Sequence, residues 1–170
     1  ARVAERIAML DLVSNGRADF GSGESSSEAE LGGFLIDPLD KRAMWEEGLR
    51  VALRCLTETP FTGHAGRYVT MPPRNVVPKP VQKPHPPVWV ACFLTPESFE
   101  WTAREGYNLL YVAYHVDPAV AKERIGWYLN ALPKFGRSAK DHQVMCCYHA
   151  HFTKSEDVSA LRGLVEQPMA

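Results

Sequence analysis

The sequence contains no apolar run approaching the roughly 20 residues that a helix needs to cross a bilayer, so we expect no membrane span. An excess of charge of either sign is also missing. The 19 basic and 20 acidic residues leave a net charge of −1, and Lys and Arg form no stripe. We therefore expect neither nucleic acid nor an anionic membrane as a partner. The four cysteines show no Cys-x-x-Cys spacing, which favours a reducing, cytoplasmic setting over a disulfide framework.

A dinucleotide-binding fingerprint is absent as well. The segment Gly21-Ser22-Gly23 lacks the third glycine of G-x-G-x-x-G and runs into an acidic, serine-rich stretch, which argues against a Rossmann site. What the sequence does contain is 170 residues, 45% of them apolar, enough for a single domain over residues 1–170 with a substantial core. Ala1 already lies in a helical pattern with no Met or N-cap before it, so we expect a fragment of a longer protein.

The stretch 75–98 organises the rest of the prediction. Five prolines between residues 78 and 87 exclude a helix in its first half. Residues 88–91 form a short apolar run that is typical of a strand covered on both faces. Thr95 is then a suitable N-cap and Pro96 occupies the first helical position, so a helix begins at the carboxyl end of this strand. Proteins with parallel sheets bind their ligands at that end.

Strand and helix patterns alternate along the whole chain. We predict strands at residues 17–20, 88–91, 108–114 and 143–152, a hairpin at 61–71 and a loop at 24–30. Helices are predicted up to Asn15, after Asp37, over 96–105, after Asp117 and after Ser155, the fourth of them burying Ala121, Ile125, Tyr128, Leu129 and Leu132. A helix followed by four strand-helix units is typical of an α/β protein with a parallel sheet, which is either an open doubly wound sheet or part of an eight-stranded barrel.

Several segments, in this order, resemble the bacterial luciferase-like family of flavin-dependent monooxygenases and their deazaflavin-dependent relatives. They are RVAERIAMLDLVSNGRADFGSG from Arg2, WEEGLRVALRCL from Trp45, FTGHAGRYVTM from Phe61, VVPKPVQKPHPPVWVA from Val76 and TPES from Thr95. The resemblance runs from about Arg2 to Asp117. Because members of the family are (β/α)8 TIM barrels, it implies about four βα units of such a barrel, with the first strands and the closing strand absent from this chain.

The resemblance also implies a cofactor site at the carboxyl mouth of the barrel, where reduced flavin, as FMN, would bind. Thr95 and Ser98, with nearby backbone N–H groups, would hold its phosphate, and the positive end of a helix suits an anion. Where many members have an arginine after the first strand of this region, the chain has Glu24. A carboxylate repels a phosphate, so an arginine contact is either lost or comes from elsewhere.

Further candidate residues follow from their places at strand ends. Gly21, Ser22 and Gly23 either line the flavin ring system or only turn the chain, and Cys92 is placed among the cofactor-binding residues or is simply a small buried side chain. His115 directly follows a strand and is a candidate acid or base, although a histidine in a surface loop before Asp117 explains it better.

One metal-like pattern is present. Cys147, His149 and His151 alternate along a strand and share a face, which is a possible ligand set. Ordinary packing on a barrel strand explains the pattern better because no carboxylate accompanies it, so we expect no metal.

The function implied by the resemblance is oxygenation of a small organic substrate with reduced flavin and O₂. A flavin reductase would then supply the reduced cofactor, and the protein would form a homo- or hetero-oligomer. One alternative is a deazaflavin (F420)-dependent dehydrogenase, which transfers hydride without O₂. Another is a silent piece of a barrel that serves as a binding or oligomerisation module. Since a piece of a barrel lacks part of its catalytic mouth, we expect no turnover from the chain alone.

Overall fold

The computed structural model describes residues 1–114 and 116–148. Its helices are α1 (Arg2–Val13), α2 (Glu28–Gly33), α3 (Lys41–Thr57), α4 (Pro96–Glu105) and α5 (Pro118–Ala131), with short 3₁₀ segments at Leu132–Phe135 and Ala139–Asp141. Its strands are β1 (Phe20–Ser22), β2 (His64–Ala65), β3 (Thr70–Met71), β4 (Val88–Cys92), β5 (Asn108–Val112) and β6 (Val144–Cys147). No helix within these ranges is long and apolar enough to cross a membrane.

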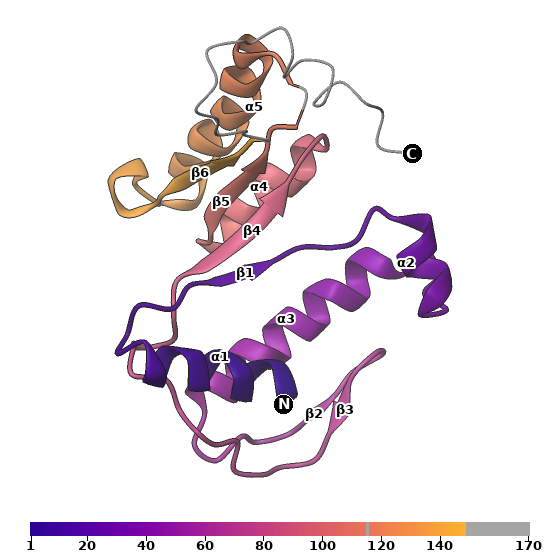
Figure 1. Cartoon of the computed structure of the whole chain (residues 1–170), viewed down its shortest axis with the longest axis vertical. Coiled ribbons are helices and arrows are strands. Elements are labelled where there is room, and N and C mark those ends of the chain that lie inside the picture. The colour runs from indigo at the N-terminus through magenta and orange to yellow at the C-terminus, as the bar shows by residue number, and fades with distance from the viewer. Residues whose placement is uncertain (115, 149–170) are drawn as a thin grey trace, which may run out of the picture.

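Four of the strands form one parallel sheet in the order β1-β4-β5-β6 (Figure 1). Phe20 pairs with Val88 at its start, and Ala91 pairs with Leu110 further along. Strands β2 and β3 form a separate antiparallel hairpin. The predicted parallel order and the predicted hairpin are both confirmed.

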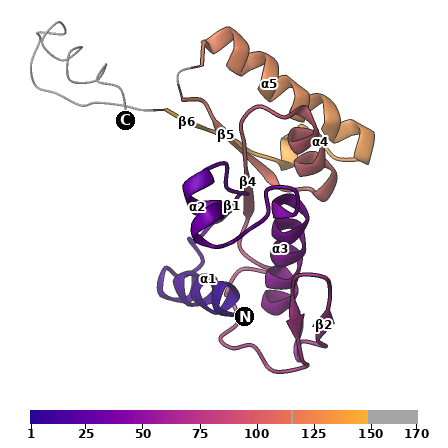
Figure 2. The same ribbon diagram turned by 90° about the vertical axis from the view of Figure 1, so that its right-hand side faces the viewer.

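The longer helices that come after β1, β4 and β5, namely α3, α4 and α5, lie on one side of the sheet, whereas the short α2 does not lie with them. Figure 2 shows α3, α4 and α5 together on that side. The ring of Phe99 on α4 lies 5.9 Å from that of Tyr111 on β5, so this helix packs directly on the sheet. Helices on a single face describe an arc of a barrel, whereas a doubly wound sheet carries helices on both faces.

The two faces of the sheet differ in burial. Val88, Val90 and Cys92 alternate along β4 and join Leu109 and Tyr111 of β5 in the core beneath the helices. On the opposite face, Ala91, Leu110 and Val112 are only partly buried, and Met145 is 48% exposed. This is the face that points toward the interior of a barrel.

A second core lies beneath the first, where α1, α3 and the proline-rich segment meet. It is built from Ala4, Ala8, Val51, Cys55, Leu56, Phe61, Met71 and Val76. The fully buried Asp11 accepts hydrogen bonds from the backbone N–H (2.8 Å) and the side-chain amide (2.7 Å) of Gln82. Burial alone would raise the pKa of Asp11, but these hydrogen bonds outweigh it and lower the pKa. Asp11 thereby fixes the proline-rich approach to β4 against α1.

The structure corrects the boundaries of two predicted strands. The first begins at Phe20 and extends to Ser22, instead of occupying 17–20. Residues before Phe20 would face Pro86 and Pro87, which have no N–H to donate, so the pairing starts at Val88. Strand β5 ends at Val112 rather than at 114 because its pairing with β6 ends there.

Two further predictions are wrong in part. Residues 24–30 were expected to form a loop, yet α2 begins at Glu28, because Ser27 accepts a hydrogen bond from the backbone N–H of Glu30. Leu129 was placed on the buried side of its helix but is 37% exposed. It follows the buried Tyr128, and adjacent helical residues point about 100° apart. The predicted helix after Ser155 and the end of the last strand lie outside the described residues.

Candidate functional site

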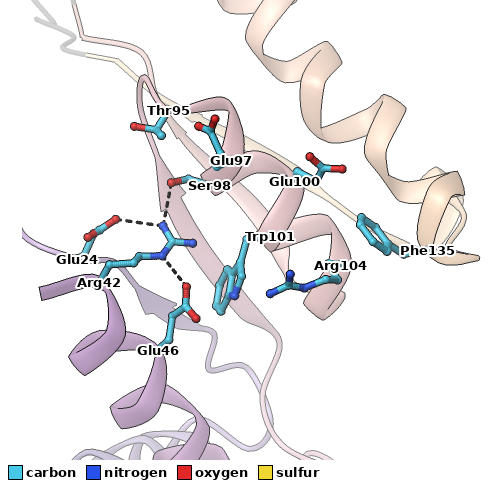
Figure 3. Close-up of a pocket in the computed structure, with 10 residues that line it drawn as sticks. All are labelled: Glu24, Arg42, Glu46, Thr95, Glu97, Ser98, Glu100, Trp101, Arg104 and Phe135. Carbon is cyan, nitrogen blue, oxygen red and sulfur yellow. Dashed lines mark hydrogen bonds and ion pairs between the residues drawn. The ribbon is translucent and has the colours of Figure 1, made fainter. Parts of the chain in front are cut away.

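Two cavities meet at the carboxyl ends of β1 and β4. The first, which we call the mouth pocket, has a volume of about 380 Å³ and is lined by Glu24, Ser26, Lys41, Ala91, Cys92, Phe93, Leu94, Thr95, Ser98, Val112 and Tyr114. The second, the helix groove, measures about 620 Å³ and is lined by Glu24, Arg42, Glu46, Thr95, Glu97, Ser98, Glu100, Trp101, Arg104 and Phe135 (Figure 3). Glu24, Thr95 and Ser98 belong to both cavities and form the boundary between them.

Arg42 connects the elements at this boundary. Its Nη1 donates to Ser98 Oγ at 2.8 Å and to Glu24 Oε1 at 3.1 Å, while its Nε donates to Glu46 at 2.6 Å (Figure 3). Burial alone would lower the pKa of Arg42, but the hydrogen bonds with Glu46 and Glu24 raise it above its usual value. The guanidinium therefore carries a permanent positive charge at the start of α4.

A second cation reaches the same carboxylate. Lys41 Nζ lies 3.4 Å from Glu24 Oε2 and donates to the backbone carbonyl of Ser25 at 2.9 Å. Glu24 therefore places one carboxylate oxygen against each of two cations, both of which come from the first turn of α3. Two adjacent cations supply charge that matches a dianion such as a phosphate monoester.

Two indole rings fix the position of the guanidinium. The Arg42 Cζ atom lies 5.1 Å from the ring centre of Trp45 and 5.0 Å from that of Trp101. The two indole rings are themselves 5.0 Å apart. Stacking on flat aromatic faces restricts a long side chain without occupying its hydrogen-bond donors, so the guanidinium is preorganised for a partner.

The structure brings the two predicted phosphate residues together at the start of α4. Thr95 is the N-cap of this helix, and its side chain makes no capping hydrogen bond. The Ser98 backbone N–H donates to the carbonyl of Thr95 at 2.9 Å, so the first turn is closed. The Ser98 hydroxyl accepts from Arg42 and keeps its own proton for another acceptor.

The segment Gly21-Ser22-Gly23, which includes the end of β1, lies against β4. A Cβ atom on Gly23 would come within 2.9 Å of the Ala91 Cβ, so only glycine allows this close approach of the two strands. A Cβ atom on Gly21 would meet nothing within 4 Å, so this residue lies beside open space. Ser22 points toward α3, where its Oγ accepts from the indole N–H of Trp45 at 2.9 Å. Its hydroxyl oxygen is thus held by Trp45, and Ser22 is not among the residues that line the mouth pocket.

Cys92 is buried on the helix side of the sheet. Its Sγ lies 3.4 Å from Thr102 Oγ1, and only 2% of the residue is exposed. Burial raises the pKa of the thiol to about 11, so it stays protonated near neutral pH and is no nucleophile. This favours the interpretation of Cys92 as a small buried residue in the wall of the mouth pocket.

The remaining histidine candidates, His115, His149 and His151, lie outside the described residues. Cys147 is described, and its Sγ lies 3.4 Å from the hydroxyl of Tyr114. Within residues 1–114 and 116–148, no group of three His, Cys, Asp or Glu side chains is placed to hold a metal ion.

The site residues that sequence reasoning missed are Lys41, Arg42 and the two tryptophans that hold Arg42 in place. Their signal was indirect. Glu24 stands where a cation was expected, and a Lys-Arg pair opens the helix that follows. Where an arginine was expected after the first strand, an arginine does lie beside Ser98, but it is Arg42 and it comes from α3.

Fold and site together define a class of protein: an arc of a (β/α)8 barrel with an anion-suited cluster at the carboxyl ends of its strands. A family model described as luciferase-like monooxygenase matches residues 1–164, and the chain belongs to this family. The resemblance seen in the sequence is thus confirmed. A relative from Sinorhizobium fredii, the uncharacterised protein y4vJ, is 31% identical over 86% of this chain and 42% of its own length.

Two further relatives have named functions. The oxygenase component of a flavin-dependent trigonelline monooxygenase from Acinetobacter baylyi is 28% identical over 92% of this chain and 43% of its own length. The crystal structure of the monooxygenase RslO1 from Streptomyces bottropensis superposes with a TM-score of 0.81 at 27% identity, over 96% of this chain and 49% of that one. An F420-dependent secondary alcohol dehydrogenase, 19% identical with a TM-score of 0.71, shares the fold. The chain spans less than half the length of these relatives.

Proposed function

We propose that this chain is part of a flavin-dependent monooxygenase that uses reduced flavin and O₂ to oxygenate a small organic substrate. The observation that carries the proposal is the cluster of Arg42, Ser98 and Thr95 at the boundary between the mouth pocket and the helix groove. The trigonelline monooxygenase component and RslO1 support it by their named activities. We further propose that residues 1–170 form a single domain of a cytoplasmic, oligomeric enzyme, and that a separate reductase supplies the reduced flavin, since the relative is named as an oxygenase component.

The residues of the mouth fit a flavin phosphate. Arg42 is a permanent cation in contact with Ser98, the Thr95 side chain makes no capping bond, and the pocket of about 380 Å³ has the size of a small-molecule site. Arg42, Ser98 and Thr95 would hold the phosphate of FMN. The backbone of Gly21 and Gly23 would border its ring system.

A bound reduced flavin supplies the electrons for the reaction with O₂, and the chain contributes binding, orientation and exclusion of water. The partly buried apolar side chains of Ala91 and Val112, together with Phe93 and Leu94, line the pocket beside the phosphate residues. They provide an apolar wall between the proposed cofactor site and the interior face of the sheet. Since relatives extend well beyond this chain, the substrate-binding residues are expected to lie largely on other strands.

The test is an anaerobic titration of the protein, expressed from its complete reading frame, with reduced FMN and with reduced F420. Preferential binding of FMN, followed by O₂-dependent product formation with an organic substrate, is the expected result. Preferential binding of F420 would favour the dehydrogenase, and binding of neither would favour a silent binding or oligomerisation module. Replacing Ser98 by Ala should weaken FMN binding about tenfold because one charge-assisted hydrogen bond is lost. Unchanged affinity in both Ser98→Ala and Thr95→Ala would place the phosphate elsewhere.

A further inference from the structure

We infer that Glu24 is an internal stand-in for the ligand's phosphate: it holds Lys41 and Arg42 in place, and a terminal phosphate monoester displaces it on binding. The inference rests on the proposed function. It assigns two cationic side chains, Lys41 and Arg42, to the phosphate, and it makes the Glu24 carboxylate the group that competes with the phosphate for them. Neither cation is on the segment that carries Thr95 and Ser98, which is the start of α4; both come from the first turn of α3.

The geometry of the three side chains carries this inference. Each oxygen of the Glu24 carboxylate faces a different cation, with Oε1 3.1 Å from Arg42 Nη1 and Oε2 3.4 Å from Lys41 Nζ. A phosphate monoester presents several oxygens of the same kind in a similar space. The cations are therefore already spaced for an oxyanion, and the carboxylate occupies the position between them.

The Arg42 nitrogen that faces Glu24 also contacts the proposed phosphate-binding residues at the start of α4. Its Nη1 is shared between Glu24 and Ser98 Oγ, the latter at 2.8 Å. Its Nη2 has no hydrogen-bond partner within the described part of the chain, so one end of the fork remains available. An anion at Thr95 and Ser98 would thus lie within reach of the guanidinium without a change in the position of α3.

Glu24 is also placed so that it can leave. It comes after Gly23, beyond the end of β1, and its side chain is 24% exposed against 31% for Arg42, so both groups have a path to water. Arg42, in contrast, is stacked on Trp45 and Trp101 and is held by Glu46 through its Nε atom. When an anion competes for the cations, the carboxylate moves more readily than the guanidinium.

This arrangement predicts selectivity. In the unliganded protein, the Glu24 carboxylate offsets the electrostatic repulsion between the neighbouring cations Lys41 and Arg42. A dianionic monoester can replace it, whereas a ligand without a phosphate cannot offer the cations an equivalent partner. Binding of FMN should therefore depend on Lys41, Arg42 and Glu24, while binding of riboflavin should not.

The experiment compares reduced FMN with reduced riboflavin in anaerobic titrations of the protein expressed from its complete reading frame. Arg42→Met is expected to weaken FMN binding about tenfold or more and to change riboflavin binding less than about twofold. Glu24→Gln is expected to strengthen FMN binding severalfold, because a competitor for the cations is removed. Arg42→Lys, which keeps the charge and loses the fork, should fall between wild type and Arg42→Met.

The matched control is Glu105→Gln, which makes the same chemical change on α4. Glu105 pairs with Arg104 at 3.2 Å and lines neither the mouth pocket nor the helix groove. It should leave both flavin affinities unchanged. If Glu24→Gln weakens FMN binding as much as Arg42→Met does, the carboxylate only holds the cations and the inference is overturned. An unchanged ratio of FMN to riboflavin affinity in Arg42→Met would overturn it as well.

A second probe separates this inference from the proposed function. If the wild-type protein binds neither flavin, the proposed function fails. The anion site is then tested with inorganic phosphate, which should raise the Tm of the wild-type protein more than that of Arg42→Met. An equal response of both proteins to phosphate would show that the cations do not form an anion site.

Discussion

At the scale of single residues, the Glu58 carboxylate after α3 shows how one ionised group fixes a loop. Arg54 donates from Nη2 to Glu58 Oε2 at 3.1 Å, and the backbone N–H of Thr62 donates to the same carboxylate at 3.0 Å. The Arg54 hydrogen bond is the largest cause, and with that of Thr62 it lowers the pKa of Glu58 to about 2. The ionised form is thus stabilised in the folded state relative to the unfolded chain.

We predict an acid-dependent loss of stability that originates at Glu58. The contribution is fully present above the unfolded carboxyl pKa of about 4.3 and is lost as the pH falls through about 2. Urea unfolding midpoints measured between pH 5 and pH 2.5 should fall less steeply in Glu58→Gln than in wild type. Glu100→Gln is the control, and its pH dependence should follow that of wild type. Parallel curves for wild type and Glu58→Gln would contradict the assignment.

Local sequence patterns indicated Thr95 and Ser98 as candidate phosphate-binding residues but did not indicate Arg42, for a physical reason. A Thr-Pro pair after an apolar strand is a local signal, since it depends on neighbours in the sequence. Arg42 contacts Ser98 across 56 positions of the chain, and no local pattern reports that distance. Glu24 and the Lys-Arg pair at the start of the next helix were the only indirect clues, because a carboxylate conflicts with an anion site unless cations accompany it.

At the scale of elements, glycine has opposite effects in two helices. Gly48 lies inside α3, and a Cβ there would meet nothing within 4 Å. Gly106 ends α4 with a φ of +78°, and a Cβ there would clash with the guanidinium of Arg137. The first is a helix-interior glycine with free space, and the second is a left-handed cap that only glycine occupies without strain.

We therefore predict that Gly48→Ala stabilises the protein by about 0.5–1 kcal/mol, because alanine loses less conformational entropy in a helix. Gly106→Ala should destabilise it by about 1 kcal/mol or more, because alanine disfavours the left-handed conformation. Both are measured as the free energy of unfolding in urea at pH 7. Equal effects of the two substitutions would contradict the conformational explanation.

The elements were predictable where the signals are local. Helix α4 begins and ends where the sequence indicates, between a Thr-Pro start and a glycine stop. Helix α2 was missed although Ser27 and Glu30 have the Ser-x-x-Glu spacing of a capping box, because six residues carry little apolar periodicity. The start of β1 depends on Pro86 and Pro87 of another strand, so only the pairing could reveal it.

At the scale of the whole molecule, the parallel sheet has two edge strands, β1 and β6. Within the described residues, β1 pairs only with β4 and β6 only with β5, so each leaves one row of backbone groups without a strand partner. The face opposite the helices includes Met145, which is 48% exposed. In a closed barrel both the edges and this face are covered by further strands.

The last prediction is that the 170-residue chain, expressed alone, associates with itself and does not turn over substrate. Open edges of a parallel sheet recruit other strands, and the catalytic mouth of a barrel draws its residues from several strand ends. The test is to measure the solution mass of the chain and its O₂-dependent product formation with supplied reduced FMN. The protein from the complete reading frame is the control. A monomer that unfolds cooperatively and completes many turnovers would refute the prediction, because four strands would then suffice for a pocket that we expect to need the rest of the barrel.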